Sequence, residues 1–169
     1  MLNSAIKLAA SHVIHGQGLI ATKLIPRGEV VWQLDSDEPI IHLTEVKSWP
    51  KEKLDEFEWF GFQWGEAEFV YCRGIERFMN HSCDPNTWWE GNQTLVVCRD
   101  IQPGEEVTYD YTTADILLDY QMRCHCSSKS CRGVITNKDY LHPDWQKKYG
   151  QHLPGHVLKA ISKTYSPSV

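Results

Sequence analysis

Apolar residues in this chain fall into short runs, which turn-forming residues interrupt at intervals of about ten positions. Runs of this length are typical of the strands of a mainly β fold. The expected strands are 9–14, 18–21, 29–34, 57–64, 68–71, 87–90 and 94–99. Two turns contain proline and glycine, at 26–28 and 102–104, and each precedes a buried strand. The first precedes the strand at 29–34, and the second precedes a further expected strand at 106–108.

Helical patterns are limited to three places, at 48–58, 75–79 and 143–163. The last is the strongest, and we expect Pro154-Gly155 to break it into two helices. Its apolar stripe should pack against the main domain, and it consists of Trp145, Tyr149, Leu153, Val157, Leu158 and Ile161.

A length of 169 residues suits one domain that buries a core of its own. No apolar run is long enough to span a membrane and no signal peptide is visible, so we expect a protein inside the cell with no membrane partner.

The net charge of -5 is unevenly distributed. Residues 29–68 hold eleven acidic residues against three lysines, whereas 136–169 is basic. An acidic surface beside an active site would attract a basic peptide and repel nucleic acid, so we expect no direct nucleic-acid binding. For most of these carboxylates a solvated helix face is an equally good explanation.

Six cysteines fall into two groups. Cys72 and Cys98 lie in strand-like stretches and are expected to be buried free thiols. The other four lie next to small polar residues that let the backbone curl around an ion, and they are Cys83, Cys124, Cys126 and Cys131. Four thiolates without an obvious histidine ligand favour a structural, tetrahedral zinc. A reduced surface loop or half of a disulfide set would also explain the cluster on its own.

The segment Gly16-Gln17-Gly18-Leu19-Ile20-Ala21 matches the dinucleotide-binding pattern G-x-G-x-x-A. A Rossmann helix would have to follow the glycines, but the turn at 26–28 interrupts the segment, so the match fails on context. What remains is a loop whose two glycines let the backbone approach a ligand closely.

The densest polar cluster covers residues 77–86, and a second motif covers 108–112. Asn80 and His81 offer directed hydrogen-bonding groups that could recognise the polar edge of a cofactor, although a single histidine is more often a satisfied core residue. In the second motif, Tyr109 and Tyr111 lie two apart on an extended segment and should face the same way. Such a pair can line a narrow channel, or it can be bonded to backbone.

Taken in order, these motifs resemble the signatures of SET-domain protein lysine methyltransferases with a post-SET zinc segment. The resemblance covers roughly residues 8–135, and the motifs that carry it are 16–18, 77–86, 104–111 and 124–131. It implies a fold of small sheets around a threaded, knot-like core, with short helices and a C-terminal helical tail. The implied divisions are a SET domain at 1–118, a post-SET zinc segment at 119–135 and a helical extension at 136–169.

The resemblance also implies roles for individual residues. Tyr111 would be the catalytic tyrosine, with Tyr109 beside it in the lysine channel. Residues that would border the S-adenosylmethionine cofactor are Gly16, Gln17, Gly18, Arg77, Phe78, Asn80, His81 and Tyr111. Residues that would bind one zinc ion are Cys83, Cys124, Cys126 and Cys131.

The implied reaction is attack of a neutral lysine amine on the methyl group of a sulfonium. An apolar channel that faces a cation disfavours the protonated amine, and no dedicated general base is expected. Because Tyr109 would hold a water and leave little room, mainly monomethyl or dimethyl product is expected. The segment 59–64 departs from the family pattern, because it has tryptophan and phenylalanine where another channel tyrosine is usual.

These expectations lead to a lysine methyltransferase that acts on a basic protein segment, with a histone tail as the first candidate. A non-histone substrate, for example a ribosomal protein, is one alternative, and a non-catalytic binding module that kept the fold is another. A histone substrate would place the protein in the nucleus or on chromosomes, and other substrates would place it in the cytoplasm. The sequence leaves the oligomeric state open.

Overall fold

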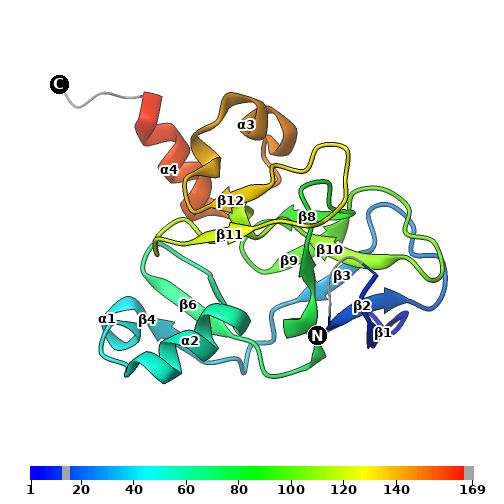
Figure 1. The fold of residues 1–169 in the computed structure, drawn as a ribbon, viewed down its shortest axis with the longest axis horizontal. Helices are drawn as coiled ribbons and strands as arrows, with labels where there is room; N and C mark the ends of the chain where they lie inside the picture. The colour runs from blue at the N-terminus through cyan, green and yellow to red at the C-terminus, as the bar shows by residue number, and fades with distance from the viewer. Residues whose placement is uncertain (13–15, 166–169) are drawn as a thin grey trace.

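The structure, a computed structural model, describes residues 1–12 and 16–165, and it is built from four small β-sheets with short helices around them (Figure 1). The largest sheet has the strand order β1-β2-β10-β7. Its strands are β1 (Ile6–Ala10), β2 (Gln17–Ala21), β10 (Glu106–Tyr109) and β7 (Asn80–His81). β10 pairs antiparallel with β2 and parallel with β7, so it joins the glycine segment to the polar cluster.

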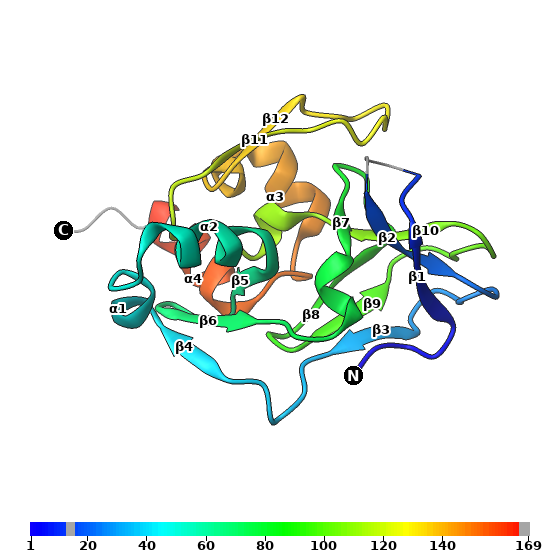
Figure 2. The same ribbon diagram turned by 60° about the horizontal axis from the view of Figure 1, so that its bottom comes forward.

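Three further sheets complete the β structure, with the orders β3-β9-β8, β4-β6-β5 and β11-β12. Their strands are β3 (Val30–Gln33), β9 (Thr94–Val97), β8 (Thr87–Glu90), β4 (Ile40–His42), β6 (Glu68–Tyr71), β5 (Gly61–Gln63), β11 (Gln121–Arg123) and β12 (Val134–Thr136). In Figure 2 the β11–β12 hairpin runs along the top edge of the molecule.

The helices are short. They are α1 (Leu43–Val46), α2 (Lys51–Phe60), α3 (Pro143–Tyr149) and α4 (Gly155–Tyr165), with single-turn 3-10 helices at Ile75–Phe78, Tyr111–Thr113 and Asp139–Leu141. The structure therefore confirms a mainly β fold of small sheets with short helices and a C-terminal helical tail.

The main core forms where β2 and β10 face the β3-β9-β8 sheet. Leu19 of β2 pairs with Val107 of β10, and neither side chain is exposed to solvent. Trp32 and Trp89 meet edge to face in the same cluster, at a ring-centroid distance of 6.2 Å. Apolar burial of this kind is the main force that holds a domain together. It fixes β10, and so it fixes the tyrosine segment that follows.

The expected strand 57–64 is partly wrong, because its first residues belong to α2. Leu54, Phe57 and Phe60 are spaced three apart and are buried or half-buried, while Trp59 is 77% exposed. A spacing of three suits a helix face, whereas a strand would bury every second residue. The strand proper is β5, and it begins at Gly61.

The other differences concern short elements and the N-terminus. The expected strand 9–14 begins earlier, at Ile6, and its positions 13–14 lie outside the described residues. The pattern missed β4, β7, β11 and β12, which have only two or three residues each and show no clear alternation. Cys72 is buried as expected, but Cys98, which follows β9, is only half-buried, and this corrects the expectation for Cys98.

The C-terminal helices pack against the main domain, as the apolar stripe predicted. The helical segment is interrupted between α3 and α4, as expected. Its apolar side chains form a buried cluster that consists of Trp145, Tyr149, Leu153 and Val157. Both α3 and α4 contact the 3-10 helix Asp139–Leu141, which follows β12 along the chain (Figure 1). The division of the chain at residues 118 and 135 stays a prediction.

Candidate cofactor cleft and metal centre

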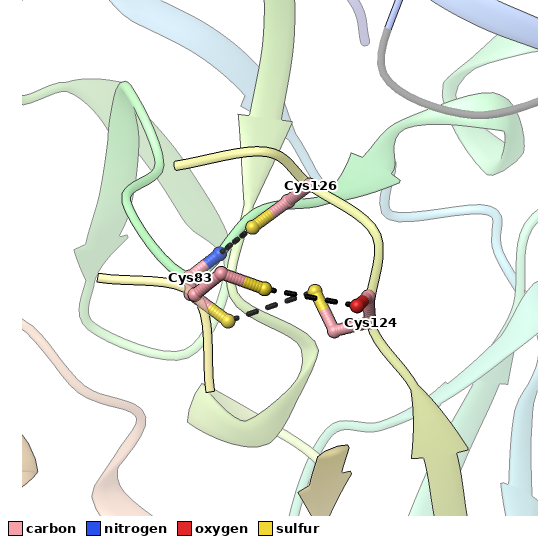
Figure 3. A group of neighbouring side chains, drawn as sticks. Cys83, Cys124 and Cys126 are labelled. Carbon is pink, nitrogen blue, oxygen red and sulfur yellow. Dashed lines mark hydrogen bonds between the residues drawn. The ribbon is translucent and has the colours of Figure 1, made fainter. Parts of the chain in front are cut away.

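The four expected thiols come together from two separate parts of the chain. Cys83 follows β7, Cys124 follows β11, and Cys126 and Cys131 lie in the loop that leads to β12. Their sulfur atoms all lie within 4.8 Å of one another, and Figure 3 shows the three labelled side chains, those of Cys83, Cys124 and Cys126, turned towards a common centre. The Sγ atoms of Cys83 and Cys124 are 3.7 Å apart.

This spacing fits a tetrahedral zinc ion. With Zn–S bonds of about 2.3 Å, tetrahedral geometry separates two sulfur ligands by about 3.8 Å. Backbone N–H groups support the sulfurs, because Cys83 N–H donates to Cys126 Sγ at 3.4 Å and Arg132 N–H donates to Cys83 Sγ at 3.4 Å. The loop curls through left-handed φ angles of +57° at Ser127 and +70° at Gly133. The donor set and its geometry therefore suit zinc as a structural ion.

The thiols differ in their readiness to ionise. Burial by itself would raise the pKa of Cys126, but hydrogen bonds from Ser128 and from the Cys83 backbone lower it to about 6. Burial and the neighbouring thiol groups raise the pKa of Cys124. Several thiolates cannot share so small a volume without a cation, and a bound metal ion would displace the remaining protons.

His81 connects the thiols to the tyrosine segment. Its Nδ1 accepts a hydrogen bond from the Tyr111 backbone N–H at 3.2 Å, and its Nε2 lies 3.3 Å from Cys83 Sγ. Burial lowers the pKa of His81 to about 4, with the nearby Asp110 carboxylate opposing that shift, so the ring is neutral at neutral pH. Because Nδ1 accepts a hydrogen bond, the ring hydrogen is assigned to Nε2, which donates it to the sulfur.

Asn80 fastens the glycine segment to β7. Its Nδ2 donates to Glu106 Oε1 at 2.7 Å and to the Gln17 backbone oxygen at 2.9 Å. A Cβ atom at Gly18 would collide with the Glu106 carboxylate. Gly18 is therefore needed for close packing against Glu106, a buried residue that the sequence motifs did not single out. Pairing of β2 with β10 brings these residues together.

A cleft of about 660 Å³ opens beside these groups. It lies within the range of roughly 300–1,000 Å³ that is usual for small-molecule sites. Of the residues expected to border a cofactor, those that line the cleft are Gln17, Arg77, Phe78, Asn80, His81 and Tyr111. Among the described residues, Gly16 and Gly18 are not part of the lining.

Arg77 is the cation best placed to bind an acidic group in the cleft. Its guanidinium lies 4.8 Å from the ring centroid of Phe60 and 5.0 Å from that of Phe78. Its Nε is buried and has no hydrogen-bond partner among the described residues. Because a guanidinium in the cleft lining attracts anionic groups, the cleft fits a cofactor with a carboxylate end, such as S-adenosylmethionine.

A smaller cavity of about 70 Å³ adjoins the cleft and shares Tyr111 and Asp115 with it. Tyr109 lines this cavity, and its ring centroid lies 4.9 Å from that of Tyr111, so the two rings lie side by side as expected. The Tyr111 hydroxyl donates to the Met79 backbone oxygen at 3.1 Å. Burial raises the pKa of both phenols, and they stay neutral at neutral pH.

Asp110, another residue that the motifs did not single out, supports the segment behind Tyr111. Its carboxylate is buried and accepts hydrogen bonds from Arg132 Nη2 at 2.7 Å, from Thr112 Oγ1 at 2.8 Å and from the Tyr149 hydroxyl at 2.7 Å. The Nε1 of Trp145 donates to Thr112 Oγ1 at 2.9 Å. The hairpin and the C-terminal helices therefore meet at one carboxylate next to the tyrosine.

Asp115 is the third acidic residue that sequence reasoning missed. It lines both the cleft and the smaller cavity, and burial raises its pKa to about 7. No motif signal marks it, because a single aspartate between apolar residues gives no indication of the cavity that it faces.

Together, these features define a domain in which a small-molecule cleft adjoins a set of thiols that fits zinc. The family model described as "SET domain" matches residues 16–112, which is more than half of the chain. The chain belongs to the SET-domain family. The resemblance drawn from the motifs is thereby confirmed.

Relatives with curated names support the same family. The chain is 34% identical over 134 residues to Histone-lysine N-methyltransferase Set2 of Drosophila melanogaster. This match covers 71% of this chain and 6% of that protein. It is also 34% identical over 134 residues to a Yarrowia lipolytica protein named Histone-lysine N-methyltransferase, H3 lysine-36 specific, covering 73% of this chain and 17% of that one. The chain thus spans only a small part of the length of these relatives.

Among solved structures, the chain is similar to the crystal structure of KRYPTONITE in complex with mCHG DNA and SAH. The TM-score is 0.56 at 21% identity, and the match covers 79% of this chain and 29% of that one. A likeness at this identity shows a shared fold. The expectation that this chain does not contact nucleic acid stays a prediction. Among the described residues, no helix has the length and apolar character of a membrane span.

Proposed function

We propose that this domain transfers a methyl group from S-adenosylmethionine to the side-chain amine of a lysine in a protein. The observation that carries the proposal is the junction at Tyr111, where a cleft of cofactor size meets a narrow aromatic cavity. Support also comes from the names of the two relatives, which are histone-lysine methyltransferases, and from the SAH bound in the structural neighbour.

The lining of the cleft suggests how its residues would hold the cofactor. Arg77 would pair with the carboxylate, because it contributes a positive charge to the lining of the cleft. Asn80 and His81 use side-chain nitrogens to bond Glu106 and Cys83, so these nitrogens are already engaged in the cleft wall. When bound, the cofactor supplies the electrophilic methyl group.

Tyr111 and Tyr109 would shape the passage for the lysine. Their rings form adjacent walls, and Tyr111 is held by its hydroxyl bond to Met79 and by the backbone bond to His81. Such fixed walls align the amine with the reacting carbon, and alignment lowers the barrier by avoiding entropy loss during the reaction. Tyr109 narrows the cavity, which favours monomethyl and dimethyl products.

Cys83, Cys124, Cys126 and Cys131 would hold zinc in a structural role. All four donors are protein thiols, and a four-thiolate ion has no open position for a substrate. The ion would fix the β11–β12 hairpin to the segment after β7. Because His81 bonds both Cys83 and the Tyr111 backbone, this fixation would extend to the catalytic tyrosine.

A basic protein segment, with a histone tail as the first candidate, is the proposed substrate. α2 borders the cleft through Phe57, Glu58 and Trp59, and its exposed face carries several acidic residues. Negative charge at the entrance would attract a lysine-rich segment. A histone substrate would place the protein at chromatin in the nucleus.

The test is transfer of labelled methyl from S-adenosylmethionine to core histones and to a whole-cell protein extract. We expect label on a histone lysine that is lost in Tyr111→Phe. Label only on other proteins would show that the substrate is a non-histone protein. Binding of S-adenosylmethionine without transfer to any protein would refute the enzyme and favour a binding module.

A further inference from the structure

Asp115 places a carboxylate between the two cavities at the proposed reaction site. It lines the cleft and the small cavity together with Tyr111. Its Oδ1 accepts a hydrogen bond from the Gln63 backbone N–H at 2.7 Å. In the described part of the chain, its Oδ2 has no hydrogen-bond partner, and Oδ2 is not among the fully buried unpartnered atoms. One oxygen is therefore anchored, and the other is available to the cavities.

Gln63 holds the Asp115 segment in place. This side chain is 2% exposed, and its Oε1 accepts hydrogen bonds from the backbone N–H groups of Ile116 at 3.0 Å and Leu117 at 2.9 Å. Its Nε2 donates to the Gly65 backbone oxygen at 2.7 Å. β5 thus fixes the backbone on the C-terminal side of Asp115, and the carboxylate is positioned rather than free to turn into solvent.

Surrounding groups set the electrostatics of this carboxylate. Burial raises its pKa to about 7, and the hydrogen bond from Gln63 opposes part of that rise. The negative charge of Asp115 in turn contributes to the raised pKa values of three phenols. The titratable and charged groups around the two cavities that matter here are Tyr109, Tyr111, Tyr120, Cys72, Glu58, Glu76 and Arg77.

Four of these neighbours, the three phenols and the Cys72 thiol, can be excluded as proton acceptors near neutral pH. The phenols are already protonated, because burial raises their pKa values. Burial also raises the pKa of the Cys72 thiol to about 12, so it too stays protonated. A carboxyl, phenol or thiol must be deprotonated before it can take a proton, and Asp115 is deprotonated in about half of the molecules at pH 7 and in more of them above that pH.

A protein lysine needs such an acceptor, because its amine arrives protonated, with an ordinary pKa of about 10.4. We propose that Asp115 is a catalytic residue that accepts this proton inside the channel. The inference rests on the proposed function. It differs from the expectation drawn from the sequence, in which the channel needs no dedicated base.

The proton and electron balance is complete. The N–H bond of the ammonium breaks, its electron pair stays on nitrogen, and the proton moves to Asp115, which leaves a neutral amine and a neutral carboxylic acid. The amine lone pair then forms the N–C bond as the C–S bond breaks, and the C–S electron pair stays on sulfur. The products are a methylated ammonium and a thioether. Asp115 later releases its proton to water in the cleft.

A purely structural role would not require an acid here. Asparagine could accept the same Gln63 hydrogen bond with its side-chain oxygen. It would also avoid the unfavourable burial of a charge. The carboxylate therefore lowers stability at a position where it has a chemical use, which is common at functional sites.

The test compares single-turnover methyl transfer to core histones, at saturating S-adenosylmethionine, for wild type, Asp115→Asn and Asp115→Glu. For Asp115→Asn we expect a loss of about 100-fold at pH 7. The loss should shrink as the pH approaches about 10, because the free amine then arrives without help. Asp115→Glu should keep part of the activity. Asp144→Asn, on the first turn of α3 away from the cleft, is the charge-matched control and should keep the wild-type pH profile.

If wild type is active, either of two results for Asp115→Asn would overturn the inference. The first is a methyl-transfer rate within about threefold of the wild-type rate at pH 7. The second is a loss of rate that is equally large at every pH. Wild type without transfer to any protein would refute the proposed function instead. A measurement without turnover complements the rates. Carbon-13 NMR of labelled aspartate should show one carboxyl titrating near pH 7 that is missing in Asp115→Asn, and its titration below about pH 5 would also refute the inference.

Discussion

Removal of one hydroxyl from α3 should destabilise the protein through the segment behind Tyr111. Tyr149 donates this hydroxyl to Asp110 Oδ2 at 2.7 Å, and both side chains are almost completely buried, at 2% and 1% exposure. Tyr149→Phe keeps the ring and its contact with Trp145, whose ring centroid lies 4.7 Å away. The change therefore deletes a hydrogen bond and little packing.

The magnitude follows from the charge of the acceptor. A hydrogen bond to a charged group contributes about 1.5–3 kcal/mol, and a buried acceptor left without its partner loses a similar amount. Asp110 keeps its hydrogen bonds from Arg132 and Thr112, and these bonds reduce the loss of stability. We therefore expect the free energy of unfolding to fall by about 2 kcal/mol.

Urea unfolding of the zinc-loaded protein measures this change as a lower midpoint with an unchanged slope. Tyr165→Phe is the matched control, because its hydroxyl donates to Gln146 at 2.7 Å on an exposed surface and its loss should change stability by less than about 0.5 kcal/mol. If Tyr149→Phe loses no more free energy of unfolding than Tyr165→Phe, the hydrogen bond between Tyr149 and the Asp110 carboxylate does not stabilise the protein, and the reasoning fails.

Three further predictions concern the site. Cys124→Ser should reduce zinc from one ion per chain and lower the melting temperature, as metal analysis and calorimetry would show; full zinc retention would remove Cys124 from the ligand set. Tyr109→Phe should shift the product towards higher methylation in mass spectrometry, and an unchanged distribution would contradict the role of its hydroxyl. Asp115 has a pKa raised from 3.8 to about 7 by burial, so it favours the folded state below pH 4, and that contribution is lost as the pH rises to about 7. Wild type should therefore lose stability relative to Asp115→Asn across that interval, by on the order of 2 kcal/mol after allowance for partial solvent access, and a constant difference would refute this.

Much of the fold could be predicted because its signals are local. The segments 68–71 and 87–90 alternate or bury apolar residues and form strands where expected. The tail breaks near Pro154 because proline and glycine disrupt helices regardless of their surroundings. The failure at 57–64 shows the limit, since four consecutive residues can satisfy both a helical and an extended pattern until packing decides between them.

The candidate site was only partly predictable. The spacing of the cysteines after β11 indicated metal ligands, because only a tight loop brings such thiols together. Glu106 and Asp110, in contrast, lie within the motif 104–111, but nothing in the sequence indicates what their carboxylates bind. Their importance depends on partners such as Asn80 and Tyr149, which lie 26 and 39 positions away along the chain.

The sequence by itself determined the mainly β character, the family and the residue types available for cofactor and metal, because these follow from local patterns and motif order. Tertiary structure decided which carboxylates are buried, which way His81 and Asn80 turn and where the two cavities meet. These properties arise from contacts between segments distant in the chain. Asp115 illustrates the difference, because its pKa and its access to the channel come from the walls that enclose it.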